Sequence, residues 1–313
     1  MPSLKVIRKR IASTKATQKI TRAMKMVAGA RLTRAQQRIV SIRPYAVKTG
    51  EVLESVARAM AASIESQTDP LHPLLARRQE KKALLIVFSA DRGLCGALNT
   101  NVNKATERTW RDKEKGGIEL AFATCGRKGR EYLARRRGNV IRDFERIYEG
   151  LDLGKAHEVA RWLIVRFERG EFDAVYLVYN EFKSAIAQKV TIDRLLPLGE
   201  PAGKPPGEAA GPRSSGERPA APDALPSSDY IFEPDERAVL ERLVPMYVEI
   251  TLYRALLESQ ASFFGAQMTA MDAATRNAKD MIERLTLEYN RARQAAITKE
   301  LMEIIGGAEA LKE

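Results

Sequence analysis

The chain of 313 residues is 44% hydrophobic and 29% charged, and its formal net charge is +12. These values are typical of a globular protein that is long enough to bury a core. Two cysteines and two histidines are too few for a disulfide framework or a Cys/His zinc site. The longest apolar run, residues 83–88, is far shorter than the roughly 20 residues of a membrane-spanning helix.

The N-terminal segment predicts one very long helix. Its inward positions alternate in steps of three and four residues, which is the stripe of a helix that packs along its length. Pro44 is expected to kink or break this helix, and the helical pattern resumes through Met60. A helix of about 80 Å is longer than a compact domain, so most of it must project. The stripe consists of Leu4, Ile7, Ile11, Thr14, Gln18, Thr21, Lys25, Ala28, Leu32, Ala35, Ile39 and Ile42.

The positive charge is concentrated in the same segment. Residues 1–50 contain 13 Lys and Arg and no Asp or Glu, whereas residues 51–313 contain 39 Lys and Arg against 40 Asp and Glu. Unopposed cations bind phosphates, so a basic nucleic-acid-binding protein with an α/β domain stays open as an alternative function. However, the cations surround an apolar stripe, and no zinc-finger or helix-turn-helix pattern accompanies them. The pattern favours a solvated face or a face that meets an acidic protein.

The middle of the chain predicts a Rossmann-like α/β domain with a mainly parallel five-stranded sheet, covered by helices on both faces. The last strand is expected to run antiparallel to the fourth because the link between them is short. The expected strands are 83–88, 118–124, 140–147, 174–179 and 185–191, and the expected helices are 99–114, 128–137 and 153–169.

The C-terminal segment predicts a second very long helix. It is expected from about Asp235 to Ile305, with interruptions near Pro245 and Gly265 and an end at Gly306-Gly307. We expect the two terminal helices to form a long antiparallel coiled coil; the alternative is that each packs separately on a large partner. The heptad-like seam comprises Met268, Met271, Thr275, Ala278, Ile282, Leu285, Tyr289, Ala292 and Ala296.

A stretch of different composition separates the α/β domain from this helix. Residues 199–229 contain seven Pro and five Gly but no aromatic residue or cysteine, which predicts a disordered insert, with an ordered docked loop as the alternative. The predicted organisation is therefore an N-terminal coiled-coil helix (1–60), a connection (61–80), an α/β foot domain (81–198), the insert (199–229) and a C-terminal coiled-coil helix (230–313).

The α/β domain offers no recognised catalytic motif. Gly93-Leu-Cys-Gly96 lacks the Gly-x-Gly-x-x-Gly spacing of dinucleotide-binding turns. The run from Gly150 to Ala156 has one residue too few for a phosphate-binding P-loop and lacks the hydroxyl residue after Lys155. No Ser/His/Asp or Cys/His set stands out. We therefore predict no catalytic, cofactor-binding or metal-binding residues.

Several motifs resemble the gamma subunit of F-type ATP synthase. They occur in the family's order and cover nearly the whole chain outside 199–229. The terminal motifs are IASTKATQKITRAMKMVA at 11–28, MTAMDAATRN at 268–277, and the run from YNRARQAAITKEL at 289–301 to IGGAEAL at 305–311. Between them lie SADRGLCGALN at 89–99, GRKG at 126–129 and LLPL at 195–198.

The resemblance implies a rotor shaft. In this family the two terminal helices enter a hexamer of three alpha and three beta subunits, while the α/β domain sits at the foot with the epsilon subunit and the membrane c-ring. Proton flow turns the shaft, which drives the catalytic sites of the beta subunits through their states. The resemblance thus implies no cofactor, no nucleic acid, and a peripheral position on the cytoplasmic face of the bacterial inner membrane, held through the Fo complex.

The resemblance also implies partner contacts. Lys25 interrupts the apolar stripe with a charge, which favours a contact with a partner. Two departures from the family stand out: Phe263-Phe-Gly-Ala-Gln-Met268 has Gln267 where an Arg is usual, and the insert lacks the cysteine pair of chloroplast relatives, so thiol regulation there is excluded. The implied rotor–sleeve contacts are Arg8, Lys9, Met24, Lys25, Met26, Gln267, Thr275 and Arg293, and the implied turn near epsilon and the c-ring is Arg92, Gly93, Leu94, Cys95 and Gly96.

Overall fold

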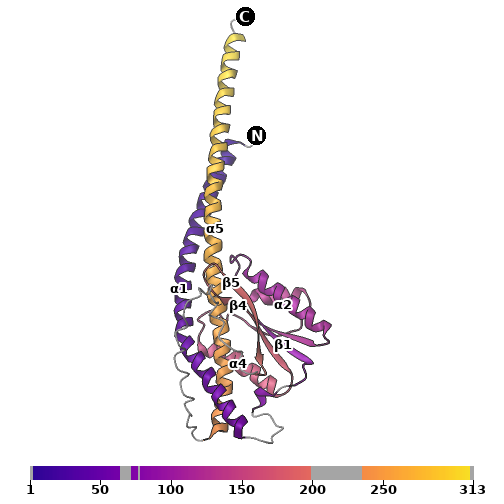
Figure 1. Cartoon of the computed structure of the whole chain (residues 1–313). Helices are drawn as coiled ribbons and strands as arrows, with labels where there is room; N and C mark the ends of the chain where they lie inside the picture. Colours follow the sequence, from indigo (N-terminus) through magenta and orange to yellow (C-terminus); the bar gives the residue numbers. More distant parts are fainter. Residues whose placement is uncertain (1–2, 64–71, 77, 199–234, 311–313) are drawn as a thin grey trace, which may run out of the picture.

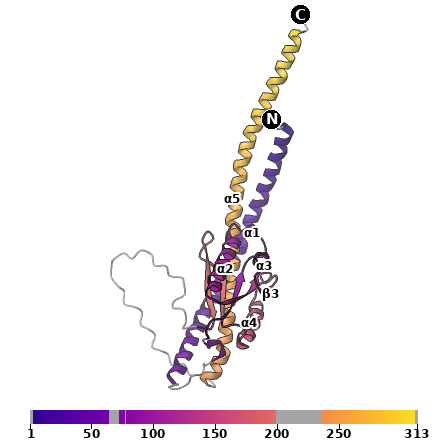
Figure 2. The ribbon, with the colours of Figure 1, turned by 90° about the vertical axis from the view of Figure 1, so that its right-hand side faces the viewer.

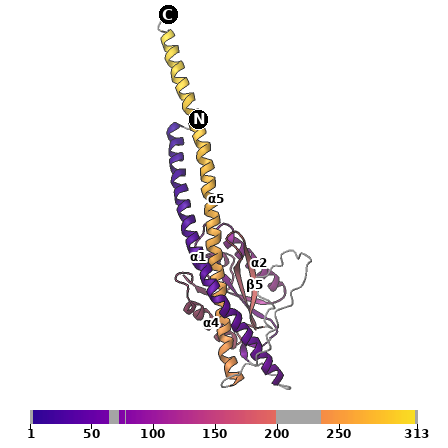
Figure 3. The ribbon, with the colours of Figure 1, turned by 60° about the vertical axis from the view of Figure 1, so that its left-hand side comes forward.

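Two long helices and one α/β domain make up the molecule. The computed structural model describes residues 3–63, 72–76, 78–198 and 235–310. Helices α1 (Leu4–Ser63) and α5 (Glu236–Ala310) run antiparallel and side by side, and the α/β domain packs beside the half of this pair that lies away from the two chain termini (Figures 1, 2 and 3). The predicted insert at 199–229 lies outside the described residues.

The predicted stripes are the surfaces along which α1 and α5 meet. All twelve stripe positions of the N-terminal helix are buried or half-buried, and so are all nine seam positions of the C-terminal helix. Thr275 donates a hydrogen bond of 2.8 Å to the Thr21 hydroxyl across the seam, which shows that the two helices face each other there. The antiparallel coiled coil predicted from the spacing is therefore confirmed.

The expected breaks in the helices are wrong. α1 continues through Pro44, and α5 continues through Pro245, Gly265 and Gly306-Gly307. Proline removes only one helical hydrogen bond, and the neighbouring helix and domain hold both segments by packing, so tertiary contacts outweigh the local preference. Gly265 has a separate reason, since a Cβ there would lie 3.2 Å from the Ala185 carbonyl oxygen. This glycine lets the α/β domain approach the helix closely.

The sheet has five strands in the order β3-β2-β1-β4-β5. All neighbouring strands are parallel except β4 and β5, as predicted. The last strand begins three residues later than expected because Ser184 and Ala187 close a turn through two hydrogen bonds of 3.0 Å. The strands are β1 (Lys82–Phe88), β2 (Glu119–Cys125), β3 (Val140–Phe144), β4 (Ala174–Phe182) and β5 (Gln188–Leu196), and the helices of the domain are α2 (Leu98–Lys115), α3 (Arg127–Arg135) and α4 (Leu153–Glu168).

The two faces of the sheet have different covers. Along β1, Ala83, Leu85 and Val87 join a cluster with Val102 of α2. The alternate residues 84, 86 and 88 join a larger cluster with α4 and α5. On α5 most fully buried residues of this cluster are spaced by four, namely Leu240, Val244, Val248, Leu252 and Leu256, and Leu257 adjoins the last of them. The long helix is thus one of the layers that cover the sheet, and the domain and the helix pair share one core.

A short helix anchors the lower end of the domain. In η1 (Pro73–Leu75) the side chain of Leu74 is completely buried, and its carbonyl accepts a hydrogen bond of 3.2 Å from Leu198. His72 caps η1 because its Nδ1 accepts a hydrogen bond of 3.1 Å from the Leu74 N–H. Burial lowers the pKa of His72, and the carboxylates of Glu168 and Glu241 oppose that shift.

This cap should be sensitive to acid. A neutral His72 is required to accept the bond, so its contribution to the free energy of unfolding is complete above about pH 6.5 and falls as the pH drops toward the lowered pKa. In His72→Asn an amide oxygen can replace the acceptor without titrating. We expect urea denaturation of the full chain to show a smaller loss of stability between pH 7.5 and 5.5 in His72→Asn than in the wild type. Equal losses in the two proteins would contradict this assignment.

Candidate functional site: the projecting shaft and its joint

The helix pair leaves the domain at one level of α5. Thr269 donates a hydrogen bond of 3.1 Å to the Ala185 carbonyl in the β4–β5 turn. Beyond this residue α5 is accompanied by α1 alone, and beyond the start of α1 it continues as a single helix (Figure 2). We call residues 4–28 of α1 and 270–310 of α5 the projecting shaft.

The end of the projecting shaft is apolar on its surface. Five large hydrophobic side chains beyond the reach of α1 are at least half exposed: Ile297, Leu301, Met302, Ile304 and Ile305. Exposed apolar residues gathered in one place usually mark a surface that another molecule covers. The shaft is also cationic, since it carries 14 Lys and Arg against seven Asp and Glu. Its chemistry therefore fits an enclosing partner with acidic and apolar surfaces.

The residues implied as rotor–sleeve contacts fall into three groups: exposed residues, half-buried residues, and residues that bond to another helix of the chain. Arg8, Lys9 and Arg293 are exposed, and the Met26 side chain is 65% exposed. Met24 and Gln267 are half-buried. The exposed group is free to meet another protein, and this role stays a prediction.

The third group, Lys25 and Thr275, bonds to residues of the opposite helix. The Lys25 ammonium lies 2.5 Å from the Asp272 carboxylate of α5, and Thr275 bonds to Thr21. The charge in the apolar stripe therefore has a partner inside the molecule, which the sequence interpretation missed. Asp272 directly follows the seam residue Met271, and this adjacency was the available signal.

A band of buried polar residues joins the shaft to the domain. Ser262 donates a hydrogen bond of 3.0 Å to the Asn180 carbonyl at the end of β4. On the other side, Gln260 donates to the Tyr148 carbonyl at 3.1 Å, and the Tyr148 hydroxyl donates to Ser259 at 3.2 Å. Sequence reasoning overlooked this joint, although the polar run 258–260 inside an apolar helix was visible.

The joint contains an ion pair within α5, and the carboxylate of this pair is almost completely enclosed. Glu258 accepts a hydrogen bond of 2.8 Å from Arg254, and its side chain is 7% exposed. Burial raises the pKa of Glu258 and the carboxylate of Glu181 adds to this effect, whereas Arg254 opposes it. Within the described part of the chain, the second carboxylate oxygen of Glu258 has no hydrogen-bond partner. Buried charges of this kind add little stability but tolerate few alternative geometries.

The unusual aromatic pair wedges the shaft against the domain. Phe263 packs beside Cys95, Leu98 and Ala266. Phe264 packs among Leu32 and Ala35 of α1 and Ala185 of the β4–β5 turn, and the Arg31 guanidinium lies 5.9 Å from the centre of its ring. The departure from the family pattern at 263–267 therefore has a structural use inside this chain.

The turn at 92–96 is held by hydrogen bonds and packs against α5 at Ala266. Asn99 holds it, because its side-chain oxygen accepts a bond of 3.0 Å from Ala90 and its amide donates to the Arg92 carbonyl at 3.3 Å. Leu94 has a φ of 64° and is 60% exposed, whereas Cys95 is buried beside Ala266. Burial raises the pKa of the Cys95 thiol, which disfavours a reactive thiolate.

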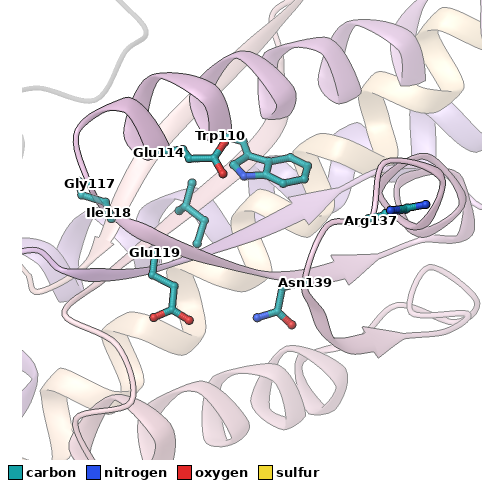
Figure 4. A pocket seen from close by; sticks show the side chains of 8 residues that line it. Trp110, Glu114, Gly117, Ile118, Glu119, Arg137 and Asn139 are labelled. Carbon is teal, nitrogen blue, oxygen red and sulfur yellow. The ribbon is translucent and has the colours of Figure 1, made fainter.

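A shallow hollow of the domain lies at the opposite end of the sheet. Figure 4 shows it between the end of α2 and the starts of β2 and β3, with a volume of about 430 Å³. Trp110 and Ile118 contribute apolar surface, while Glu114, Glu119 and Arg137 contribute charges of both signs. Among the described residues no group of three or more His, Cys, Asp or Glu is placed to hold a metal ion.

A membrane-crossing helix is likewise not found in the described ranges, where no helix combines the required length and apolarity.

Comparison with solved structures supports the fold. A chain from the Euglena gracilis mitochondrial ATP synthase, in an OSCP/F1/c-ring structure, superposes with a TM-score of 0.62 at 20% identity, covering 98% of this chain and 94% of that one. A chain from the Tetrahymena thermophila mitochondrial ATP synthase central stalk and c-ring gives a TM-score of 0.56 at 22% identity, covering 82% and 99%. At these identities the likeness concerns the fold alone.

Comparison of sequences is more specific. A family model described as ATP synthase matches residues 3–311. The ATP synthase gamma chain of Sorangium cellulosum is 53% identical over 330 aligned positions, and that of Geotalea uraniireducens is 46% identical over 312, each match covering the full length of both chains. The chain therefore belongs to the ATP synthase gamma chain family.

Proposed function

We propose that this chain is the central-stalk rotor subunit of an F1Fo ATP synthase, which transmits torque between a proton-driven c-ring and the catalytic beta subunits. The observation that carries the proposal is the rigid projection of a two-helix shaft from a domain that shares its core. Torque that acts on the domain reaches the shaft only if the domain cannot turn about the shaft. Family membership supports the same role and leaves the nucleic-acid-binding alternative without support.

The projecting shaft would lie in a sleeve of alternating alpha and beta subunits. The single-helix end, with Leu301 and Ile304 exposed, would reach deepest and meet apolar surface. Further down, exposed cations such as Arg8, Lys9 and Arg293 would face acidic loops. Exposed charge pairs are weak and easily exchanged, which suits a surface that must slide from one partner loop to the next.

The other end of the domain would face the epsilon subunit and the c-ring, and through them the cytoplasmic side of a bacterial inner membrane. The resemblance implies that the turn Arg92–Gly96 also lies near epsilon and the c-ring, but its position in the fold suggests a different neighbour. It packs against Ala266, close to the level at which the shaft leaves the domain, and away from Ser63 and Glu236, where α1 ends and α5 begins. This position favours the underside of the sleeve as the neighbour of Leu94, in place of the c-ring.

We infer that the chemistry of ATP belongs to other subunits. The groups that a phosphate site would need, a glycine-rich cradle with a lysine and a hydroxyl, do not converge in the domain, and the hollow beside Trp110 carries mixed charge on an open surface. The contribution of this chain is mechanical: it holds an asymmetric shaft at one angle to the domain.

Neutralising the exposed cations should weaken the sleeve contact. For Arg8→Gln/Lys9→Gln we expect assembly with alpha and beta subunits to persist, and the salt dependence of ATP hydrolysis by the reconstituted complex to fall about twofold, because weak exposed pairs are lost. Lys104→Gln/Lys115→Gln removes two exposed cations of α2 and serves as the control. A shaft variant with unchanged assembly, coupling and salt dependence would contradict the proposed contact.

The ion pair within α5 should stabilise the helix at the joint. Arg254→Gln leaves the enclosed Glu258 carboxylate without its partner, so we expect a loss of about 2 kcal/mol in the free energy of unfolding at pH 7, allowing for the partial exposure of Arg254. The loss should shrink as the pH falls, because Glu258 can take up a proton. Arg254→Gln/Glu258→Gln, which removes the charge, should recover most of the stability in urea denaturation. A double variant no more stable than Arg254→Gln would contradict this.

A further inference from the structure

A polar layer crosses the shaft just above the domain. Asp272 lies three residues beyond Thr269, the last residue of α5 that bonds to the β4–β5 turn. Lys25 contacts it at 2.5 Å, and Arg276 lies 3.3 Å from its other carboxylate oxygen. One turn further along, Thr275 bonds to the Thr21 hydroxyl at 2.8 Å. Among the described residues of the projecting shaft, Lys25 and Asp272 form the one ion pair that connects the two helices.

The seam around this layer contains several small side chains beside the larger Met268 and Met271. Ala28 and Ala278 are buried in it, and a Cβ at Gly29 would lie 3.5 Å from the Met268 sulfur. Small side chains allow the helices to approach closely, but they interlock less deeply than large knobs in holes. Packing in this stretch therefore distinguishes poorly between neighbouring registers of α1 and α5.

The charges distinguish these registers. Facing residues have numbers that add up to 296 or 297, as in Thr21 with Thr275 and Lys25 with Asp272. A slip of one heptad toward the tip of α5 would place Lys25 opposite Lys279 and Asp272 opposite the buried Leu32. Both contacts are unfavourable, the first by repulsion and the second by loss of water around a carboxylate.

A slip in the other direction loses the pair as well. It would place Lys25 opposite Gly265, which is packed against the domain, and Asp272 opposite Gln18. The observed register is thus the one of the three in which both charges meet opposite charges. A polar position in a coiled-coil seam is an established means of fixing register.

The expected energetic effect is a difference between registers. The side chains of Lys25 and Asp272 are 44% and 33% exposed, so the pair adds little to overall stability. The hydrogen bond from Lys25, followed by the charge of Arg276, nevertheless lowers the pKa of Asp272, which shows that the carboxylate is favoured in its charged form. The observed register is favoured because the two slipped registers place these charges in less favourable surroundings.

We propose that Lys25, Asp272, Thr21 and Thr275 form a register lock, a set of positioning residues that keeps the two helices from slipping where torque passes from the domain into the projecting shaft. This inference rests on the proposed rotor function. Its place in the fold fits the role, because below this level the domain holds α5, whereas above it only α1 does. The lock also gives Lys25 a role that needs no contact with the sleeve.

The register can be measured directly on the full chain. Gln18→Cys with Ala278→Cys reports the observed register by disulfide formation, and Gln18→Cys with Leu285→Cys reports the slipped one. We expect Lys25→Glu, which would attract Lys279 in the slipped register, to raise the ratio of slipped to observed disulfide about tenfold, within the range of coupling between contacting charges. Lys25→Gln, which removes only the charge, should raise it less. The swap Lys25→Glu/Asp272→Lys should restore the wild-type ratio.

A second readout tests the mechanical role. In vesicles that contain the reconstituted complex, proton pumping per ATP hydrolysed should fall severalfold in Lys25→Glu and in Asp272→Lys, and should recover in the swap. Lys104→Glu, which reverses an exposed charge on α2 outside the shaft, is the control and should leave both readouts unchanged.

The possible results test the register lock and the rotor function separately. A swap that fails to restore the register, or single variants that behave like Lys104→Glu, would overturn the lock. A shifted register with unchanged pumping would overturn its mechanical role. A wild-type chain that supports no ATP-driven pumping with its alpha and beta subunits would instead refute the proposed function, while the disulfide ratio would still decide whether the lock exists.

Discussion

The packing of α5 against two partners at once determines the rest of the structure. Fully buried residues such as Leu240, Val248 and Leu256 cover one face of the sheet, and the same helix carries the coiled-coil seam along which it meets α1. Burial of each such side chain contributes about 1.5–3 kcal/mol. Because the domain and the shaft share this core, the domain cannot turn about the shaft without unfolding, and torque applied to one must reach the other.

Apolar packing makes the connection strong, and polar groups make it specific. At the joint, the bonds from Ser262 to Asn180 and from Gln260 to Tyr148 fix how α5 lies on the domain. Above the joint, Lys25 and Asp272 lie where the small side chains of the seam discriminate least. Each polar contact adds little stability, but each one penalises the neighbouring arrangement, which matters in a part that must transmit force without slipping.

The sequence predicts the fold far better than it predicts the site. Spacing alone identifies both seams and the five strands, because long amphipathic patterns and buried strands leave strong periodic signals. It fails at Pro44, where packing with a distant segment outweighs local preference. It also misses the internal partner of Lys25, because that partner lies 247 residues away and a charge in an apolar stripe looks the same whether its partner is internal or external.

The central claim is that this chain rotates as one rigid body within a fixed sleeve, and direct observation of rotation tests it most closely. In a complex with immobilised alpha and beta subunits, a bead attached to an exposed position of the α/β domain, such as Lys104 on α2, is followed by light microscopy during ATP hydrolysis. The account predicts stepped rotation in one direction. A bead that stays in place while ATP is hydrolysed at the normal rate would contradict it.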